Sequence, residues 1–172
     1  MKKSTLCYFS WRVILVEHSW ESFVISESGN DPRVKALVYA AAFVPDHGET
    51  LVTLIAKATP TQLSTSLQLV DGFLTLTREG VRKVFVGDLP EKEQDLVYSV
   101  KKPASPNVFN AVANDPAWKQ KNFWYTISTE DETINLESEH IMTKRAHAKT
   151  AEIKASHLPM VYKPQEVLNV IF

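Results

Sequence analysis

Cysteine is almost absent from this 172-residue chain, in which Cys7 is the only one. A single cysteine cannot form an internal disulfide, and it excludes zinc or iron–sulfur sites built from several cysteines. A reducing compartment fits best, and we expect a cytoplasmic protein. The opening MKKSTLCYFSWRVILV has a basic start and an apolar stretch, but Arg12 interrupts the stretch and no small-residue cleavage site follows. A secretory signal is therefore not expected.

Long apolar runs and an excess of charge are also missing. No run reaches the roughly 18 apolar residues that a membrane-spanning helix needs. Lysine and arginine number 19 against 20 acidic residues, which leaves a formal charge of -1 and no overall attraction to nucleic acid or anionic membrane. We therefore expect neither nucleic acid nor a membrane as a partner.

Internal repeats, low-complexity tracts and Gly/Ser linkers are absent as well. The composition, 44% hydrophobic and 23% charged, is that of an ordinary globular protein. The length suits one core and is too short for two ordinary domains. We expect a single domain over residues 1–172.

Two apolar runs near the amino terminus predict buried strands. Residues 12–16, RVILV, and residues 33–43, RVKALVYAAAF, have the continuous apolar pattern of strands buried on both faces. A helix is expected between them over residues 19–28, since Gly29 and Asn30 supply a helix stop. Strand, helix and strand form a βαβ unit, so the sequence predicts an α/β fold with a mostly parallel sheet.

The chain from about residue 46 to residue 116 has a different pattern. Helical spacing in GETLVTLIAKA and LPEKEQDLVYSV predicts a mainly helical insertion that caps the sheet. Strands are expected again at 122–131 and 150–155, with a helix at about 136–146 and a closing helix from Pro164. We expect about four strands with flanking helices.

Three reactive side chains follow predicted strands. Ser19 comes after the first strand, Asp131 ends the segment NFWYTISTED, and His157 follows TAEIKA. Functional residues of parallel sheets gather at the carboxyl ends of the strands. The chain order Ser, Asp, His is that of the α/β-hydrolase triad, so these placements favour nucleophilic catalysis.

The same segments resemble the α/β-hydrolase superfamily, and within it the small bacterial esterase-like serine hydrolases. VILVEHSWESFVI resembles the family's strand, nucleophile elbow and helix, and DPRVKALVYAAAFVPDHGE the next strand and the start of the cap. YTISTEDETI resembles the acid loop, and ASHLPMVYKPQEV the histidine loop. The resemblance covers nearly the whole chain and implies a shortened α/β-hydrolase fold. It implies Ser19 as nucleophile, His157 as general base, Asp131 as the residue orienting the imidazole, and the Trp20 backbone N–H in the oxyanion hole.

The elbow departs from the family pattern Gly-x-Ser-x-Gly, because Glu17 and Glu21 occupy the two glycine positions. Glycine suits a strained turn in which these positions crowd each other and the neighbouring strands. Two glutamates should open the turn or leave one carboxyl protonated. Their charge also opposes the oxyanion formed at Ser19. We therefore expect weak or absent activity.

The segment before the predicted nucleophile strand is also short. Only about eleven residues precede it, whereas the family places several strands there, together with the loop that provides a second oxyanion N–H. The strand would then lie at an edge of the sheet with unpaired backbone groups. Pairing with a second copy or with another chain would cover that edge, so a homodimer is one hypothesis.

Each candidate residue also has a structural interpretation. Ser19 could begin a helix, and His157 could be a satisfied structural histidine. Asp131 could begin a turn or cap the following helix, and Glu130 or Glu132 could substitute for it in part. His18 is interpreted as structural. Metal ligation by Glu137, His140 and His147 is less favoured than a solvated helix face, because the spacing is not that of His-Glu-x-x-His. No metal or cofactor is expected.

Three hypotheses of function remain. The first is a serine hydrolase that acts on a small ester-like substrate through an acyl-serine intermediate, with activity weak or lost. The second is an inactive hydrolase-like module that binds a small apolar ligand or a partner protein. The third is a fragment of a longer gene product, or a degenerate copy. The sequence does not distinguish esters, lactones or halogenated compounds as substrates.

Overall fold

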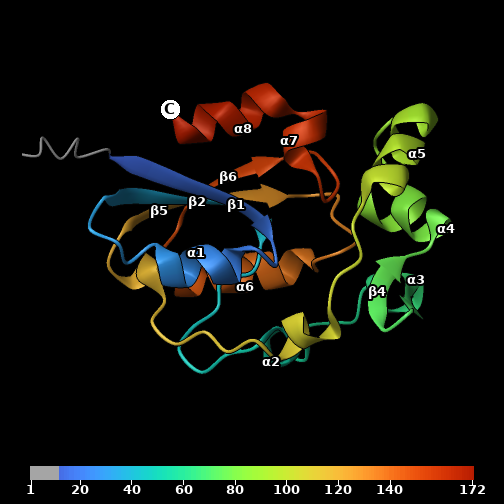
Figure 1. Cartoon of the computed structure of the whole chain (residues 1–172). Helices are drawn as coiled ribbons and strands as arrows, with labels where there is room; N and C mark the ends of the chain where they lie inside the picture. Colours follow the sequence, from blue (N-terminus) through green and yellow to red (C-terminus); the bar gives the residue numbers. More distant parts are fainter. Residues whose placement is uncertain (1–11) are drawn as a thin grey trace, which may run out of the picture.

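A four-stranded parallel sheet lies at the centre of the computed structural model, which describes residues 12–172 (Figure 1). The strands have the order β1, β2, β5, β6, and each neighbouring pair is parallel. Their bounds are β1 Val13–Ser19, β2 Val34–Ala42, β5 Asn122–Ser128 and β6 Lys149–Ile153. The prediction of about four mostly parallel strands is confirmed.

Burial of each strand follows its place in the sheet. β2 lies between two strands, and all of its residues except Lys35 are buried. β1 lies at one end of the sheet, where Val13, Ile14 and Val16 are 36%, 43% and 42% exposed. Both strands have continuous apolar sequences, so the apolar pattern alone does not distinguish the central strand from the edge strand. The edge position expected for the first strand agrees with the strand order within residues 12–172.

Helices cover both faces of the sheet (Figure 1). On one face lie α1 (Ser22–Ser28) and α6 (Leu136–Arg145), and on the other lies α8 (Pro164–Ile171), preceded by the short α7 (Pro159–Tyr162). The main core lies between the sheet and the first pair of helices and includes Phe23, Ile25, Leu37, Tyr39, Tyr125 and Met142. This arrangement leaves the carboxyl ends of the strands free to carry a site.

The chain between β2 and β5 forms short elements, of which those within residues 63–100 lie as a group beside the sheet, whereas Leu51, Leu54 and Ala117 belong to the main core (Figure 1). A second hydrophobic cluster, which includes Leu76, Val81, Phe85 and Leu89, holds part of this group together. The helices and strands between β2 and β5 are α2 Leu51–Ile55, α3 Leu63–Ser66, β3 Leu67–Val70, β4 Phe73–Leu76, α4 Arg78–Gly80, a π-helical turn Val81–Phe85, α5 Glu91–Val100, and 3-10 turns Pro106–Asn110 and Ala117–Lys119.

The expectation of a mainly helical insertion omitted one element. β3 and β4 form an antiparallel hairpin whose two turn residues, Asp71 and Gly72, have φ values of 48° and 80°. Positive φ at both central residues is the geometry of a type I′ hairpin turn, for which Asp-Gly is a preferred pair. The Asp-Gly pair that predicts this turn was therefore present in the sequence, between the segments LQLV and FLTL.

No helix within residues 12–172 is long and apolar enough to cross a membrane.

Candidate active site

Ser19 lies on a sharp turn between β1 and α1. It is the last residue of β1, and its φ of 57° is in the left-handed region that non-glycine residues adopt only at a cost of about 1 kcal/mol or more. The Glu21 N–H donates to the His18 carbonyl oxygen at 3.2 Å, and the Ser22 hydroxyl donates to the Ser19 carbonyl oxygen at 2.8 Å. The strand thus extends through Ser19, and the helix begins at Ser22 instead of at residue 19.

The three side chains predicted at the strand ends are joined by hydrogen bonds. His157 Nε2 is 2.9 Å from Ser19 Oγ, and His157 Nδ1 is 2.7 Å from Asp131 Oδ2. An ionised carboxylate can only accept, so Nδ1 carries the proton and Nε2 accepts from the serine hydroxyl. In this tautomer His157 can take the Ser19 proton.

Asp131 is fixed by the loop that follows β5. The carboxylate is buried, and its Oδ1 accepts N–H groups from Thr133 at 2.6 Å and from Ile134 at 3.1 Å. Both lone-pair directions of Oδ1 are therefore used, which leaves Oδ2 for the imidazole. The rest of the acidic stretch lies elsewhere, because Glu132 is exposed and Glu130 is 3.5 Å from Lys154.

His157 is positioned by two residues that the sequence analysis did not assign to the site. Asp88, in the insertion, accepts the Ser156 N–H at 2.6 Å and the Ser156 hydroxyl at 2.5 Å. His18 Nε2 donates to the His157 carbonyl oxygen at 2.7 Å, and the two imidazole rings lie 4.4 Å apart. Burial, and then the nearby His157, holds the pKa of His18 well below its usual value, so His18 stays a neutral donor.

Ser19 opens into a pocket of about 150 Å³ between the sheet and the insertion. The pocket walls are mostly apolar and include the aromatic side chains of Trp20, Phe43, Phe85 and Phe109. The Trp20 indole N–H donates to the Val108 carbonyl oxygen at 2.9 Å, so its ring is fixed against the insertion. Such a pocket suits a small apolar molecule.

A bulge at the end of β2 directs the chain toward this pocket. The pairing with β1 skips Ala41, which has a φ of 42°. The Tyr125 hydroxyl holds the bulge, because it accepts the Ala42 N–H at 2.8 Å and donates to the Ala42 carbonyl oxygen at 2.6 Å. Phe43, the next residue, lines the pocket. Bulges commonly redirect side chains beside functional sites.

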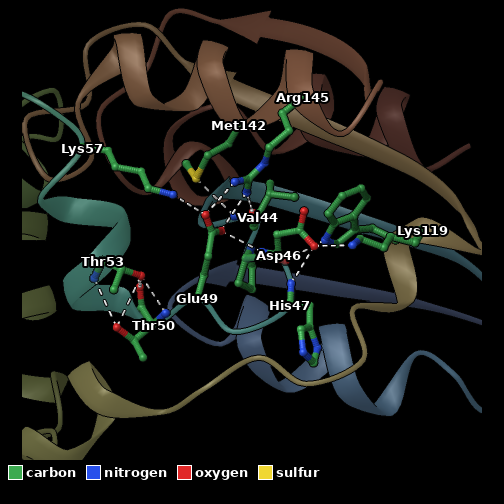
Figure 2. Close-up of polar contacts among 12 residues, drawn as sticks. Val44, Asp46, His47, Glu49, Thr50, Thr53, Lys57, Lys119, Met142 and Arg145 are labelled. Carbon is green, nitrogen blue, oxygen red and sulfur yellow. Dashed lines mark hydrogen bonds and ion pairs between the residues drawn. The ribbon is translucent and has the colours of Figure 1, made fainter.

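The loop after this bulge is anchored by a network of charged side chains around Glu49 (Figure 2). Arg145 donates to both Glu49 carboxylate oxygens, at 2.7 Å and 3.0 Å, and Lys57 donates to one of them at 2.5 Å. Although burial opposes it, these hydrogen bonds lower the pKa of Glu49 to about 2. Arg145 also donates to the Val44 carbonyl oxygen, so the network ties α6 to the start of the insertion.

Comparison with solved structures decides the fold. The chain superposes on polyneuridine aldehyde esterase with a TM-score of 0.78 at 16% identity, covering 94% of this chain and 72% of that one. It superposes on a pyrethroid hydrolase from Sphingobium faniae JZ-2 with a TM-score of 0.79 at 22% identity, covering 94% and 69%. An extracellular alpha/beta-hydrolase from a Paenibacillus species gives a TM-score of 0.73 at 18% identity, covering 94% and 71%.

The chain has the α/β-hydrolase fold.

Sequence comparison adds a relative that is named as an esterase. The chain is 31% identical over 108 residues to the carbendazim hydrolyzing esterase of Nocardioides sp. strain SG-4G. The match covers 62% of this chain and 37% of that esterase, so the matched part spans well under half of the relative's length. No family model matches the sequence.

In the α/β-hydrolase fold the elbow normally has glycines where this chain has Glu17 and Glu21. The turn nevertheless forms, with Ser19 in the left-handed conformation. The expectation was an opened turn or one protonated carboxyl, and the first of these alternatives is not observed. Because no strand lies beyond β1 within residues 12–172, Glu17 is only half-buried and Glu21 is exposed. Burial, and then the charge of Glu21, raises the pKa of Glu17. The two glutamate side chains therefore repel each other to some extent, as expected.

The Trp20 backbone N–H lies directly after the turn, and no hydrogen-bond acceptor for it is found in the part of the chain that the structure describes. This N–H is therefore available, within the described residues, to donate to a group bound beside Ser19. Residues 12–172 contain no group of three His, Cys, Asp or Glu side chains close enough together to hold a metal ion. His140 instead lies 3.8 Å from Glu152.

Proposed function

We propose that the chain is a serine hydrolase that cleaves a small ester-like substrate through an acyl intermediate on Ser19. The observation that carries the proposal is the unbroken hydrogen-bonded series Ser19, His157, Asp131 beside an apolar pocket. The esterase name of the sequence relative supports the reaction class. The carbonyl carbon of a bound ester is the electrophile that this arrangement suits.

The reaction follows from the tautomer of His157. Ser19 Oγ attacks the ester carbonyl carbon while His157 Nε2 takes the hydroxyl proton, and the imidazolium that forms is stabilised by Asp131. The tetrahedral oxyanion accepts the Trp20 N–H. Its collapse breaks the bond to the alcohol oxygen, which receives the proton from His157. Water then repeats these steps on the acyl-serine and releases the acid.

Turnover of 4-nitrophenyl acetate tests the mechanism. Ser19→Ala and His157→Ala should lower kcat by about 10⁴-fold or more, because each removes a group that acts on the reacting atoms. Asp131→Asn should cost a similar factor, since an amide N–H facing Nδ1 would move the imidazole proton to Nε2. Rates equal to the wild-type rate in all three variants would contradict the mechanism.

A second candidate function is binding without hydrolysis. It is favoured by the two glutamates beside Ser19, because burial and then the charge of Glu21 raise the pKa of Glu17. An inactive module would be stabilised thermally by small apolar ligands while showing no turnover of any 4-nitrophenyl ester. Turnover that depends on Ser19 would eliminate this candidate.

The assembly and the compartment are further proposals. We propose a homodimer in which the exposed edge of β1, with its apolar Val13, Ile14 and Val16, pairs with a second copy. Sedimentation at micromolar concentration should show the dimer, and a clean monomer would contradict it. A cytoplasmic location is our prediction from the single cysteine.

A further inference from the structure

The pocket that contains Ser19 has an uneven distribution of charge. Its walls are apolar apart from a few hydroxyl groups and two lysines, Lys101 and Lys102, and no aspartate or glutamate lines it. Both lysines directly follow α5, where the chain returns toward the sheet. The pocket therefore combines an apolar interior with positive charge on one side.

A second cavity, of about 190 Å³, adjoins this pocket and shares wall residues such as Phe43, Leu63 and Phe109 with it. Its charged wall residues, Lys57 and Arg145, are already paired, because both donate to Glu49 (Figure 2). This cavity thus offers apolar surface and no available charge. It suits the hydrocarbon part of a ligand whose ester group lies at Ser19.

Lys101 differs from these paired cations. Its ammonium nitrogen lies 4.0 Å from the centre of the Phe85 ring, and within residues 12–172 no hydrogen bond or ion pair is found for it. Phe85 in turn packs 4.9 Å from the His157 ring, and Lys101, Phe85 and Ser19 line the same pocket. Burial lowers the pKa of Lys101, and the charge of Glu21 opposes that effect only in part. A half-buried ammonium without a carboxylate partner is stabilised by an anion that enters the pocket.

We propose that the Ser19 pocket selects esters that carry a free carboxylate, with the carboxylate at Lys101 and the hydrocarbon part in the adjoining apolar cavity. The titratable groups that face this position are Lys102, His18, His157 and Glu21, and only Glu21 is acidic. The selection concerns the same site as the proposed hydrolase activity and rests on it for turnover. For a half ester of a dicarboxylic acid, water cleaves the bond between acyl carbon and alcohol oxygen, and the products are the dicarboxylate, the alcohol and one proton.

Binding and turnover test the selection separately. Hexanoate and hexanamide have nearly the same shape and differ in charge, and neither is hydrolysed as an ester. Calorimetry with the wild-type chain should show that hexanoate binds at least about ten-fold more tightly, as expected for a charge-assisted contact. Lys101→Met should abolish the preference while keeping the apolar stem, and Lys101→Arg should retain it.

Lys92→Met provides the matched control, since Lys92 is an exposed lysine on α5 that lines neither cavity. This variant should keep the preference for hexanoate. Equal Kd values for hexanoate and hexanamide in the wild type, or a preference that Lys101→Met leaves unchanged, would overturn the proposed selection.

Turnover measurements distinguish a failure of the proposed carboxylate selection from a failure of the proposed hydrolase activity. The wild-type kcat/KM for mono(4-nitrophenyl) adipate should exceed that for 4-nitrophenyl hexanoate by about ten-fold, and Lys101→Met should remove the difference. Hydrolysis of both esters at equal rates would overturn the selection and leave the hydrolase standing. Absence of hydrolysis together with a Lys101-dependent preference for hexanoate would overturn the hydrolase and support a carboxylate-binding pocket.

Discussion

At the scale of single residues, Ser19 holds a left-handed backbone between two glutamates. Glycine is useful at the flanking positions of such a turn where strands press on both sides. Here β1 is an edge strand in the described structure, and the Glu17 and Glu21 side chains have room beside it. The remaining cost is electrostatic, because both charges oppose negative charge developing at Ser19.

The double variant Glu17→Gln/Glu21→Gln separates charge from shape. It should raise kcat/KM for the neutral substrate 4-nitrophenyl acetate several-fold, since a nearby unit charge in partly solvated surroundings is worth about 1 kcal/mol. Glu17→Gly/Glu21→Gly should give a similar gain, because the turn already forms with side chains at both positions. Steady-state kinetics measures both.

The matched control is Glu93→Gln, an exposed acid on α5 whose loss should leave kcat/KM unchanged. If only the glycine variant gains activity, the penalty is steric and the electrostatic explanation is wrong.

At the scale of elements, the site depends on a contact between the insertion and the loop after β6. Asp88, between the π-helical turn and α5, accepts both the N–H and the hydroxyl of Ser156, the residue before His157. The insertion therefore does more than enclose the pocket. It also fixes the backbone that carries the imidazole.

Asp88→Ala should lower kcat by about 10- to 100-fold with a smaller change in KM, because displacement of a reacting group by about 1 Å has effects of that size. Asp88→Asn should be milder, since its carbonyl oxygen can still accept the Ser156 N–H. Kinetics, together with amide hydrogen exchange at Ser156, measures both effects.

Asp115→Ala is the control for this experiment, because Asp115 is exposed and its side chain has no hydrogen bond within residues 12–172. Unchanged kcat and exchange in Asp88→Ala would show that the His157 loop is held in place without the insertion.

At the scale of the whole molecule, one carboxyl group is buried beneath the site. Glu139 is fully buried, its Oε2 accepts the Ser128 N–H at 3.0 Å, and its Oε1 has no partner within residues 12–172. Burial, and then the charge of Asp131, raises the pKa of Glu139 well above its ordinary value. The folded chain therefore holds a proton that the unfolded chain releases near the ordinary pKa of a glutamate.

The raised pKa of Glu139 makes the free energy of unfolding depend on pH in one direction. Between the unfolded and folded pKa values of Glu139 the folded state binds more protons, so the free energy of unfolding should fall as pH rises through that interval. Glu139→Gln keeps the size and the acceptor for Ser128 but does not titrate, so this part of the fall should disappear. Urea denaturation at several pH values between 5 and 8 measures the effect.

Glu137→Gln, an exposed position on the same helix, is the control and should keep the wild-type pH dependence. Parallel curves for the wild type and Glu139→Gln would mean that Glu139 ionises normally in the folded chain.

Much of the fold and three residues of the candidate site could be predicted from local patterns. The apolar runs identified the four strands, and the positions of Ser19, Asp131 and His157 after three of them indicated that these residues meet. Parallel strands place their carboxyl ends at one edge, so that inference needs no coordinates. The hairpin at Asp71 and Gly72 could have been predicted from its turn pair.

Asp88, His18 and Lys101 could not be assigned in this way. Each affects the site through a partner distant in sequence: Asp88 through Ser156, His18 through the His157 carbonyl oxygen, and Lys101 through the Phe85 ring. No local period or motif encodes such pairs, because they depend on how the insertion packs against the sheet.

The sequence alone determined the α/β architecture and the order of the three hydrogen-bonded residues, because hydrophobic periodicity and strand-end positions are local properties of the chain. Only the tertiary structure decided whether the elbow could form with two glutamates, how the insertion packs against the sheet, and that the Lys101 ammonium lies over the Phe85 ring. These properties depend on the space and charge that residues far apart in the chain provide for one another once packed.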